Sequence, residues 1–136
     1  MLIPKKVKHR KWQKGRARNI RTASTKIELA FGSYGLKAMT PAWISSQEIE
    51  AGRRVLTRYI KKGGKVWIRV FPDKPVTKKG SEVPMGAGKG APDHYVAVIR
   101  PGTIIYEMDG IPPEVAKEAL QSAGYKLSPV CKYVSK

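Results

Sequence analysis

The uneven distribution of charge is the feature that most constrains this sequence. Residues 1–92 carry 22 lysines and arginines and five acidic residues, a net charge of +17, whereas residues 93–136 carry five of each. A compact domain with this much unbalanced charge repels itself unless a polyanion neutralises it. The sequence therefore predicts a neutral scaffold in the last third of the chain. It predicts a surface for nucleic acid or an anionic membrane in the first two thirds.

Length and cysteine content narrow the class of protein further. A chain of 136 residues is the size of one domain, and Cys131 is its single cysteine, so no intrachain disulfide can form and a reducing compartment is expected. Residues 1–14 lack the apolar run of a signal peptide, and the longest apolar run, Tyr95–Ile99, is far too short to span a membrane. These features predict a cytoplasmic protein with one domain, residues 1–136.

The N-terminal segment, residues 1–26, contains ten basic residues and no acidic one. Its few apolar residues follow neither strand nor helix periodicity, so by itself the segment buries too little surface to offset its ordering entropy. It is either a solvated tail or, the interpretation we favour, an arm that folds onto RNA phosphates. Trp12 is available there to stack on a base or sugar.

A helix is predicted from Ser45 to about Lys62. Ser45 and Glu48 have the spacing of a capping box, and Ile44 and Ile49 that of a hydrophobic staple. One apolar stripe follows at helical spacing, formed by Ile49, Gly52, Val55, Leu56, Tyr59 and Ile60. Gly63-Gly64 is expected to end the helix. Its later cations either complement the helix dipole or contact phosphate, and they are Arg54, Arg58, Lys61 and Lys62.

Alternating apolar residues predict strands on both sides of this helix. The expected strands are Thr25–Phe31, Tyr34–Met39, Lys65–Phe71 and a hairpin of His94–Arg100 with Thr103–Met108, which turns at Pro101-Gly102. Within Lys65–Phe71, Trp67 is expected in the core in preference to an RNA-stacking surface.

The last third adds a second helix and a final strand. Pro112-Pro113 opens the helix, Gly124 ends it, and its apolar face consists of Val115, Ala116, Ala119, Leu120 and Ala123. Tyr133-Val134 is expected in a closing strand. The whole pattern predicts an α+β sandwich with a mostly antiparallel sheet system and two helices packed on it.

The apolar alternation stops between residues 72 and 92, which predicts an extended loop rich in glycine, proline and lysine. Its glycine-rich part, residues 85–90, differs from a nucleotide-binding P-loop, because Gly90 stands where a hydroxyl residue is required and no helix follows. The segment is better suited to bring bare backbone close to RNA, with Lys89 as a point charge.

Catalytic and metal-binding patterns are weak in this sequence. His9 lies in the basic arm and His94 at the start of a strand, and the acidic residues are scattered. No His, Cys or acidic pair has metal-ligand spacing. Cys131 has no evident base partner and is expected to be a small, partly buried side chain. The sequence predicts neither an enzyme nor a metal site nor a cofactor.

Two motifs resemble the signatures of a known family, the bacterial-type large ribosomal subunit protein L-sixteen. The first motif runs from Gly63 to Pro75, and the second is Met85-Gly86-Ala87-Gly88-Lys89-Gly90. Further segments are similar to the family in order along the chain, namely residues 1–5, 9–11, 31–36, 47–51 and 106–110. The family usually has basic residues where Pro84 and Ala87 stand in this chain.

The resemblance implies an α/β-hammerhead fold and a place in the large ribosomal subunit, of bacterial or organellar type. It also implies contacts with large-subunit rRNA near the peptidyl transferase region and with A-site and P-site tRNA. Partners would be rRNA, tRNA and neighbouring large-subunit proteins, with no membrane and no small-molecule substrate. Since Pro84 cannot make the contact of the family's arginine, that contact would be lost or would be supplied by Lys78, Lys79 or Lys89.

The residues expected to carry these contacts fall into two sets. The rRNA-binding set is Lys5, Lys6, Lys8, Arg10, Lys11, Trp12, Lys14, Arg16, Arg18, Arg21, Arg54, Arg58, Lys61 and Arg69. The set in the loop near tRNA is Lys74, Lys78, Lys79, Met85, Gly86, Gly88, Lys89 and Gly90.

Three other functions remain open on the sequence alone. A free-standing nucleic-acid regulator would need a base-reading element, and no helix-turn-helix, zinc finger or RNA-recognition motif is present. An RNA-processing enzyme would have to use His94 with a carboxylate such as Asp93. A membrane-binding protein would use the basic arm on anionic lipid.

Overall fold

The computed structural model describes residues 2–14, 22–60 and 63–136. Its elements are β1 (Tyr34–Ala38), β2 (Ala42–Ser45), α1 (Ser46–Tyr59), β3 (Lys65–Ile68), β4 (Lys74–Lys78), β5 (Ala91–Ile99), β6 (Ile104–Asp109), α2 (Pro113–Gly124) and β7 (Cys131–Ser135). One sheet has four strands in the order β3-β6-β1-β7, and the other has three in the order β2-β5-β4. The strand pairs are antiparallel. The predicted α+β class with two helices is confirmed.

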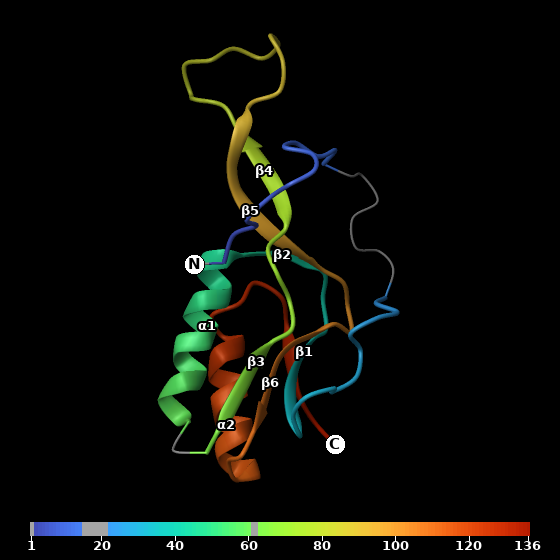
Figure 1. The fold of residues 1–136 in the computed structure, drawn as a ribbon, viewed down its shortest axis with the longest axis vertical. Coiled ribbons are helices and arrows are strands. Elements are labelled where there is room, and N and C mark those ends of the chain that lie inside the picture. Colours follow the sequence, from blue (N-terminus) through green and yellow to red (C-terminus); the bar gives the residue numbers. More distant parts are fainter. Residues whose placement is uncertain (1, 15–21, 61–62) are drawn as a thin grey trace.

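The two helices and the four-stranded sheet form the body of the molecule. The helices α1 and α2 lie side by side and pack on one face of this sheet (Figure 1). Fully buried side chains between the layers include Leu36, Ile49, Leu56 and Leu120. The three-stranded sheet begins beside the body and runs away from it, so that β4 and β5 project as a hairpin (Figure 1).

The start of α1 follows its local sequence. The Oγ of Ser45 accepts the N–H of Glu48 at 3.2 Å, and the Glu48 carboxylate accepts the N–H of Ser45 at 3.4 Å, so the predicted capping box is present. Ile44 and Ile49 are both fully buried. The helix ends at Tyr59, earlier than expected, and Lys61 and Lys62 lie outside the described residues.

A glycine in the middle of α1 makes room for a tyrosine from the sheet. Gly52 lies on the buried stripe, and a Cβ at this position would collide with the hydroxyl of Tyr106 from β6. That hydroxyl donates a hydrogen bond to the main-chain oxygen of Ile49 at 2.7 Å, and burial raises the pKa of Tyr106. Helix and sheet are therefore joined by a buried polar contact that requires glycine at position 52.

The sequence prediction of a hairpin between His94–Arg100 and Thr103–Met108 is wrong. Both strands exist, but β5 pairs with β2 and β4, whereas β6 pairs with β1 and β3 in the other sheet. The turn at Pro101-Gly102, where Gly102 has a φ of +98°, carries the chain from one sheet to the other. Turn residues specify a reversal of direction but not the partner of each strand.

The prediction of a structureless loop from residue 72 to 92 is also wrong in part. Strand β4 occupies Lys74–Lys78 and pairs with the N-terminal half of β5, from Ala91 to Val96. The register shifts between Val76 and Thr77. Within the predicted loop, residues 72–73 and the tip between the strands, residues 79–90, are without regular structure. Strand propensity missed β4 because Pro75 lies within it.

A segment that we call the strap, residues 22–32, was expected to form a strand over Thr25–Phe31 but has none. Its main chain touches the body at a few places, such as the N–H of Ile104, which donates to Lys26 O at 2.8 Å. A Cβ on Gly32 would lie 2.5 Å from the main-chain oxygen of Met108, so the strap lies too close to β6 there for any larger residue. Ile27 and Phe31 are exposed by 37% and 58%, so the expected apolar face is not buried.

The second helix and the final strand agree with their predictions. Helix α2 begins after Pro112 and ends at Gly124, with Ala116, Ala119, Leu120 and Ala123 buried. Strand β7 contains Tyr133 and Val134 and pairs with β1. Cys131 is partly buried, as expected.

Candidate nucleic-acid interface

The described cations of the arm, Lys5, Lys6, Lys8, Arg10, Lys11 and Lys14, are all exposed. Trp12 is 41% exposed, and Leu2 packs against the core cluster, so the arm is anchored at its start. Three further cations expected here, Arg16, Arg18 and Arg21, lie outside the described residues. The arm therefore presents a series of ammonium and guanidinium groups from a segment that begins against the body.

Lysine side chains connect the arm to the projecting hairpin. Lys11 Nζ donates to the main-chain oxygen of Lys89 at 2.9 Å, and Lys89 Nζ donates to that of Trp12. Lys74 Nζ donates to the main-chain oxygen of Lys14 at 2.7 Å. Residues 11–14 are thus hydrogen-bonded both to the base of the hairpin and to its tip. Sequence reasoning treated the arm and the loop as separate and gave no sign of these contacts.

Lys74 does not lie in the loop, contrary to expectation. It is the first residue of β4, and only 9% of its surface is exposed. Its ammonium group lies 4.3 Å from the centre of the Trp43 ring, the geometry of a cation–π contact. Lys74 therefore stabilises the base of the hairpin.

The tip of the hairpin carries the other residues expected near tRNA. Lys78 ends β4 and is exposed, Met85 is completely exposed, and Lys79 Nζ donates to Gly86 O. Gly86, Ala87 and Gly88 all have left-handed φ angles, of 100°, 59° and 93°. Alanine rarely adopts such an angle, and strained backbone of this kind is typical of functional loops.

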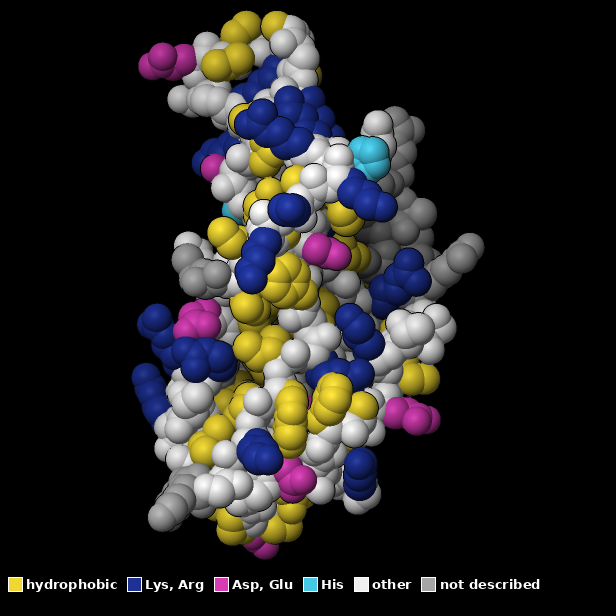
Figure 2. Space-filling view, in the orientation of Figure 1, with side chains coloured by type: hydrophobic (Ala, Val, Ile, Leu, Met, Phe, Trp, Pro, Cys, Tyr) yellow, Lys and Arg dark blue, Asp and Glu magenta, His cyan; other side chains and the backbone are white. Residues whose placement is uncertain are grey.

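Lys and Arg side chains gather just below the tip of the hairpin and along both flanks of the body in Figure 2. On α1, Arg54 and Arg58 are exposed, and Arg54 Nε lies 3.5 Å from the Glu50 carboxylate. Arg53 also pairs with Glu50, and its guanidinium holds the pKa of Glu50 down to about 2. Lys61 lies outside the described residues.

Arg69 was expected to contact rRNA, but the structure gives it a partner inside the protein. Its guanidinium forms an ion pair with Glu107 and lies 5.3 Å from the centre of the Phe31 ring. Only 14% of the Arg69 side chain is exposed, and none of Glu107. Arg69 therefore belongs to the body and not to the exposed cations.

Glu107 is a structural residue that sequence reasoning overlooked. One oxygen accepts the N–H groups of Ala30, Phe31 and Gly32 at 2.9–3.0 Å, and the other meets Arg69. Burial by itself would raise the pKa of Glu107, but the Gly32 N–H, Arg69 and the other two N–H groups together hold it below its ordinary value. The charged carboxylate thus holds the strap on the outer face of the sheet.

Trp67 also lies on this outer face, beneath the strap. Its ring stacks on Phe31 with 6.0 Å between centres and 20° between planes. The ring is half-buried and lies outside the hydrophobic core, so the expected core position is wrong; Trp67 instead packs against the strap on the outer face of the sheet.

The residues of the enzymatic alternative lie on the projecting part of β5. His94 Nδ1 is 2.8 Å from an Asp93 oxygen, and both side chains are 49% exposed. This contact joins neighbouring residues at the surface. Burial raises the pKa of the Cys131 thiol to about 11, so the thiol is protonated near neutral pH.

Metal and membrane sites would each require a specific arrangement of residues. Among residues 2–14, 22–60 and 63–136, no three His, Cys, Asp or Glu side chains come together as a metal site would need. Neither α1 nor α2 combines the length and apolar character needed to cross a bilayer.

The fold and the charge distribution define a class, namely a small α+β protein that presents cations on an arm and a projecting hairpin. A family model described as ribosomal protein L16p/L10e matches residues 4–134, nearly the whole chain. The chain belongs to this family of ribosomal proteins. It is a structural constituent of the large ribosomal subunit.

Proposed function

We propose that this protein braces large-subunit rRNA with its arm and helix α1, and that its hairpin tip helps to position A-site and P-site tRNA near the peptidyl transferase region. It acts through its position and its charge and catalyses no reaction. Its partners are rRNA, tRNA and neighbouring large-subunit proteins. The observation that supports this most is the β4–β5 hairpin, which projects from the body, ends in an exposed tip and is hydrogen-bonded to the basic arm.

The connection between arm and hairpin suggests how the two contacts cooperate. Lys11, Lys74 and Lys89 each donate a hydrogen bond to a main-chain oxygen between the arm and the hairpin. When phosphates order the arm, the same hydrogen bonds restrain the hairpin, because residues 11–14 cannot shift without breaking them. An arm bound to rRNA therefore orients a tip that reaches further into the particle.

Shortening the tip tests the tRNA part of this proposal. Replacement of residues 80–88 by Asn-Gly keeps the β4–β5 pairs and Lys89, since it leaves a loop of three residues, Asn-Gly-Lys89, between Lys79 and Gly90, and three residues suffice to close a hairpin. Ribosomes carrying this variant should accommodate tRNA at least about tenfold more slowly, while the protein enters large subunits at the normal level. Equal loss of assembly and accommodation would refute the division of roles.

A second variant separates reach from charge. Lys78→Gln with Lys79→Gln keeps the full length of the tip and removes two cations. If charge near tRNA supports accommodation, this variant should fall between the normal and shortened proteins. If only length matters, it should behave as the unchanged protein does.

A further inference from the structure

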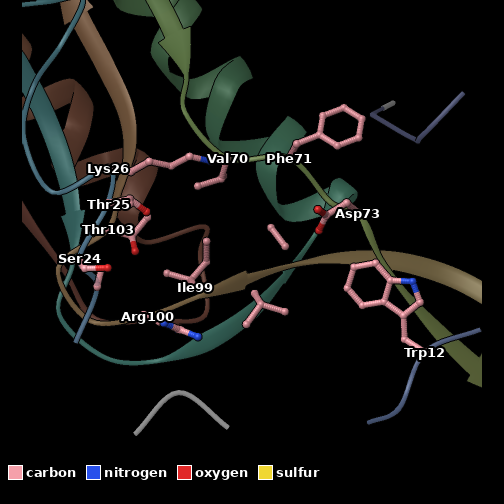
Figure 3. A pocket seen from close by; sticks show the side chains of 13 residues that line it. Trp12, Ser24, Thr25, Lys26, Val70, Phe71, Asp73, Ile99, Arg100 and Thr103 are labelled. Carbon is pink, nitrogen blue, oxygen red and sulfur yellow. The ribbon is translucent and has the colours of Figure 1, made fainter. Parts of the chain in front are cut away.

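A cavity of about 340 Å³ opens where the arm, the strap and the edge of the three-stranded sheet meet. Val70 and Ile99, both nearly inaccessible to solvent, form its apolar floor. Trp12 and Phe71 stand on one side with Asp73 between them, and Lys26 and Arg100 stand on the opposite side (Figure 3). The volume is at the lower end of the range for small-ligand pockets.

The two aromatic side chains of the cavity are each nearly half exposed to solvent. Trp12 is 41% exposed and Phe71 is 44% exposed, although both line the cavity. Trp12 is also held in place, because its main-chain oxygen accepts the ammonium group of Lys89 and its neighbour Lys11 bonds to the hairpin. Exposed aromatic faces beside an apolar floor are what an unstacked nucleobase binds.

Asp73 places a carboxylate at the cavity. It is the one acidic side chain among the described residues that line the cavity, in a chain of net charge +17. A carboxylate repels phosphate and only accepts hydrogen bonds, so the group it receives has to be a donor. Guanine carries two adjacent donors on its Watson–Crick edge, N1–H and the N2 amino group, which match the two carboxylate oxygens. Adenine and cytosine offer one amino group there, and uracil one N–H between two acceptors.

The opposite wall supplies charge for the nucleotide backbone. Lys26 and Arg100 bring cations from the strap and from the turn after β5. Lys26 has a left-handed φ of 57°, and its main-chain oxygen accepts the N–H of Ile104, so this wall is fixed to the body. A base inserted between the walls would leave its flanking phosphates near these cations.

We propose that this cavity takes an unpaired guanine of the large-subunit RNA, stacked against Trp12 and Phe71, with Asp73 accepting from N1–H and the N2 amino group. The inference rests on the proposed RNA-bracing function and adds a base-specific contact to it. The cations of the arm bind any sequence, whereas the cavity determines the register of the protein on its RNA.

Binding of the full chain to short oligouridylates with one substituted central base tests the assignment. The central base is guanine, inosine (which lacks the N2 amino group), adenine or uracil. A bidentate contact discriminates by about fivefold or more, so the guanine oligomer should bind at least that much tighter than the uracil oligomer, with inosine between them. Asp73→Asn should reduce the preference to within about twofold and leave binding of the uracil oligomer unchanged or slightly tighter.

Matched variants separate base recognition from charge and folding. Asp93→Asn removes the same charge from an exposed position on β5 and should keep the guanine preference. Trp12→Ala should weaken binding of the guanine oligomer by about fivefold or more, because the stacking surface is removed. Equal affinity for all four oligomers, or an unchanged preference in Asp73→Asn, would overturn the inference. Equal affinity for all four oligomers is also the result expected if the cavity instead receives a segment of a neighbouring protein.

Adding the same proteins to large subunits that lack this chain distinguishes this inference from the proposed function. Sedimentation measures whether each protein joins the subunit, and tRNA accommodation is measured on the resulting ribosomes. A chain that joins the subunit but shows no guanine preference contradicts the cavity assignment alone. A chain that prefers guanine but makes no difference to tRNA accommodation contradicts the proposed function alone.

Discussion

The body and the arm–hairpin region differ in what their cations contact. In the body, Arg69 is paired with the buried carboxylate of Glu107, and Arg53 is paired with Glu50 on α1. In the arm and the hairpin, Lys11, Lys74 and Lys89 donate to main-chain oxygens, and most neighbouring cations face solvent. Main-chain oxygens hold an ammonium group in place but do not cancel its charge.

This difference explains how a chain of net charge +17 keeps a stable fold. Carboxylates lie where they hold the body and its strap together. The uncompensated cations lie on the arm and the hairpin, which extend from the body, and a polyanion is needed to neutralise them. Loss of a body carboxylate should therefore affect stability, and loss of arm cations should affect binding.

The largest effect on stability is expected for Glu107→Ala. The change leaves Arg69 without its partner and three N–H groups of the strap without their acceptor. Removing one member of a buried pair costs about 3–5 kcal/mol, which urea unfolding would measure. Glu118→Ala, an exposed glutamate on α2, is the control and should change stability by less than about 0.5 kcal/mol. Equal effects would show that the body does not depend on the buried carboxylate.

Acid should weaken the same interaction. Because the pKa of Glu107 is lowered in the folded protein, its contribution is complete above its unfolded pKa of about 4.3 and is lost as the pH falls through the folded value. The free energy of unfolding should therefore decrease more steeply below that pH in the unchanged protein than in Glu107→Gln. Parallel curves would contradict the lowered pKa.

Next in size is the decrease in RNA affinity when arm cations are removed. Replacing Lys5, Lys6, Lys8 and Arg10 by glutamine should weaken binding to subunits that lack this chain by at least about tenfold, or 1.4 kcal/mol. The slope of log affinity against log salt should fall by roughly 0.7–0.9 for each phosphate that the variant no longer neutralises. The urea unfolding curve should stay unchanged.

The neutral last third supplies a control with the same change of charge. Replacing its exposed Lys117, Lys126, Lys132 and Lys136 by glutamine should leave most of the affinity intact. If both sets weaken binding equally, total charge matters and its position does not.

A smaller effect is expected from the cap of α1. Ser45→Ala removes the acceptor for the Glu48 N–H and should cost about 1 kcal/mol in urea unfolding. Gln47→Ala, at an exposed position in the same turn, should have little effect. RNA affinity should stay the same in both variants, since the cap belongs to the body.

The smallest effect is expected from the surface pair of α1. Arg53→Gln removes a partner of Glu50, yet this pair lies at the surface, where solvent and side-chain entropy offset most of the attraction. The urea midpoint should not move measurably. A shift as large as that of Glu107→Ala would remove the distinction between buried and surface pairs.

Several features could be predicted from sequence because their causes are local. The cap of α1 depends on Ser45 and Glu48, three residues apart, and the start of α2 on Pro112-Pro113. The exposed cations of the arm follow from a segment too polar to be buried. For the described part of the interface, residue type alone predicted the exposure of Lys5 through Lys11.

Other features depend on residues far apart in the chain. Lys74 and Arg69 look like the other cations in sequence, yet one lies over Trp43 and the other pairs with Glu107. The cavity also depends on distant residues, since Trp12 of the arm, Lys26 of the strap and Ile99 of the three-stranded sheet come together only in the folded chain.

The sequence by itself determined the charge asymmetry, the two helices and the family, because each of these depends only on neighbouring residues or on composition. Only the tertiary structure decided which strands pair, which cations are neutralised inside the protein and where the arm meets the hairpin. The physical reason is that strand partners and buried ion pairs are selected by packing and desolvation across the whole fold. Local propensity carries no information about either.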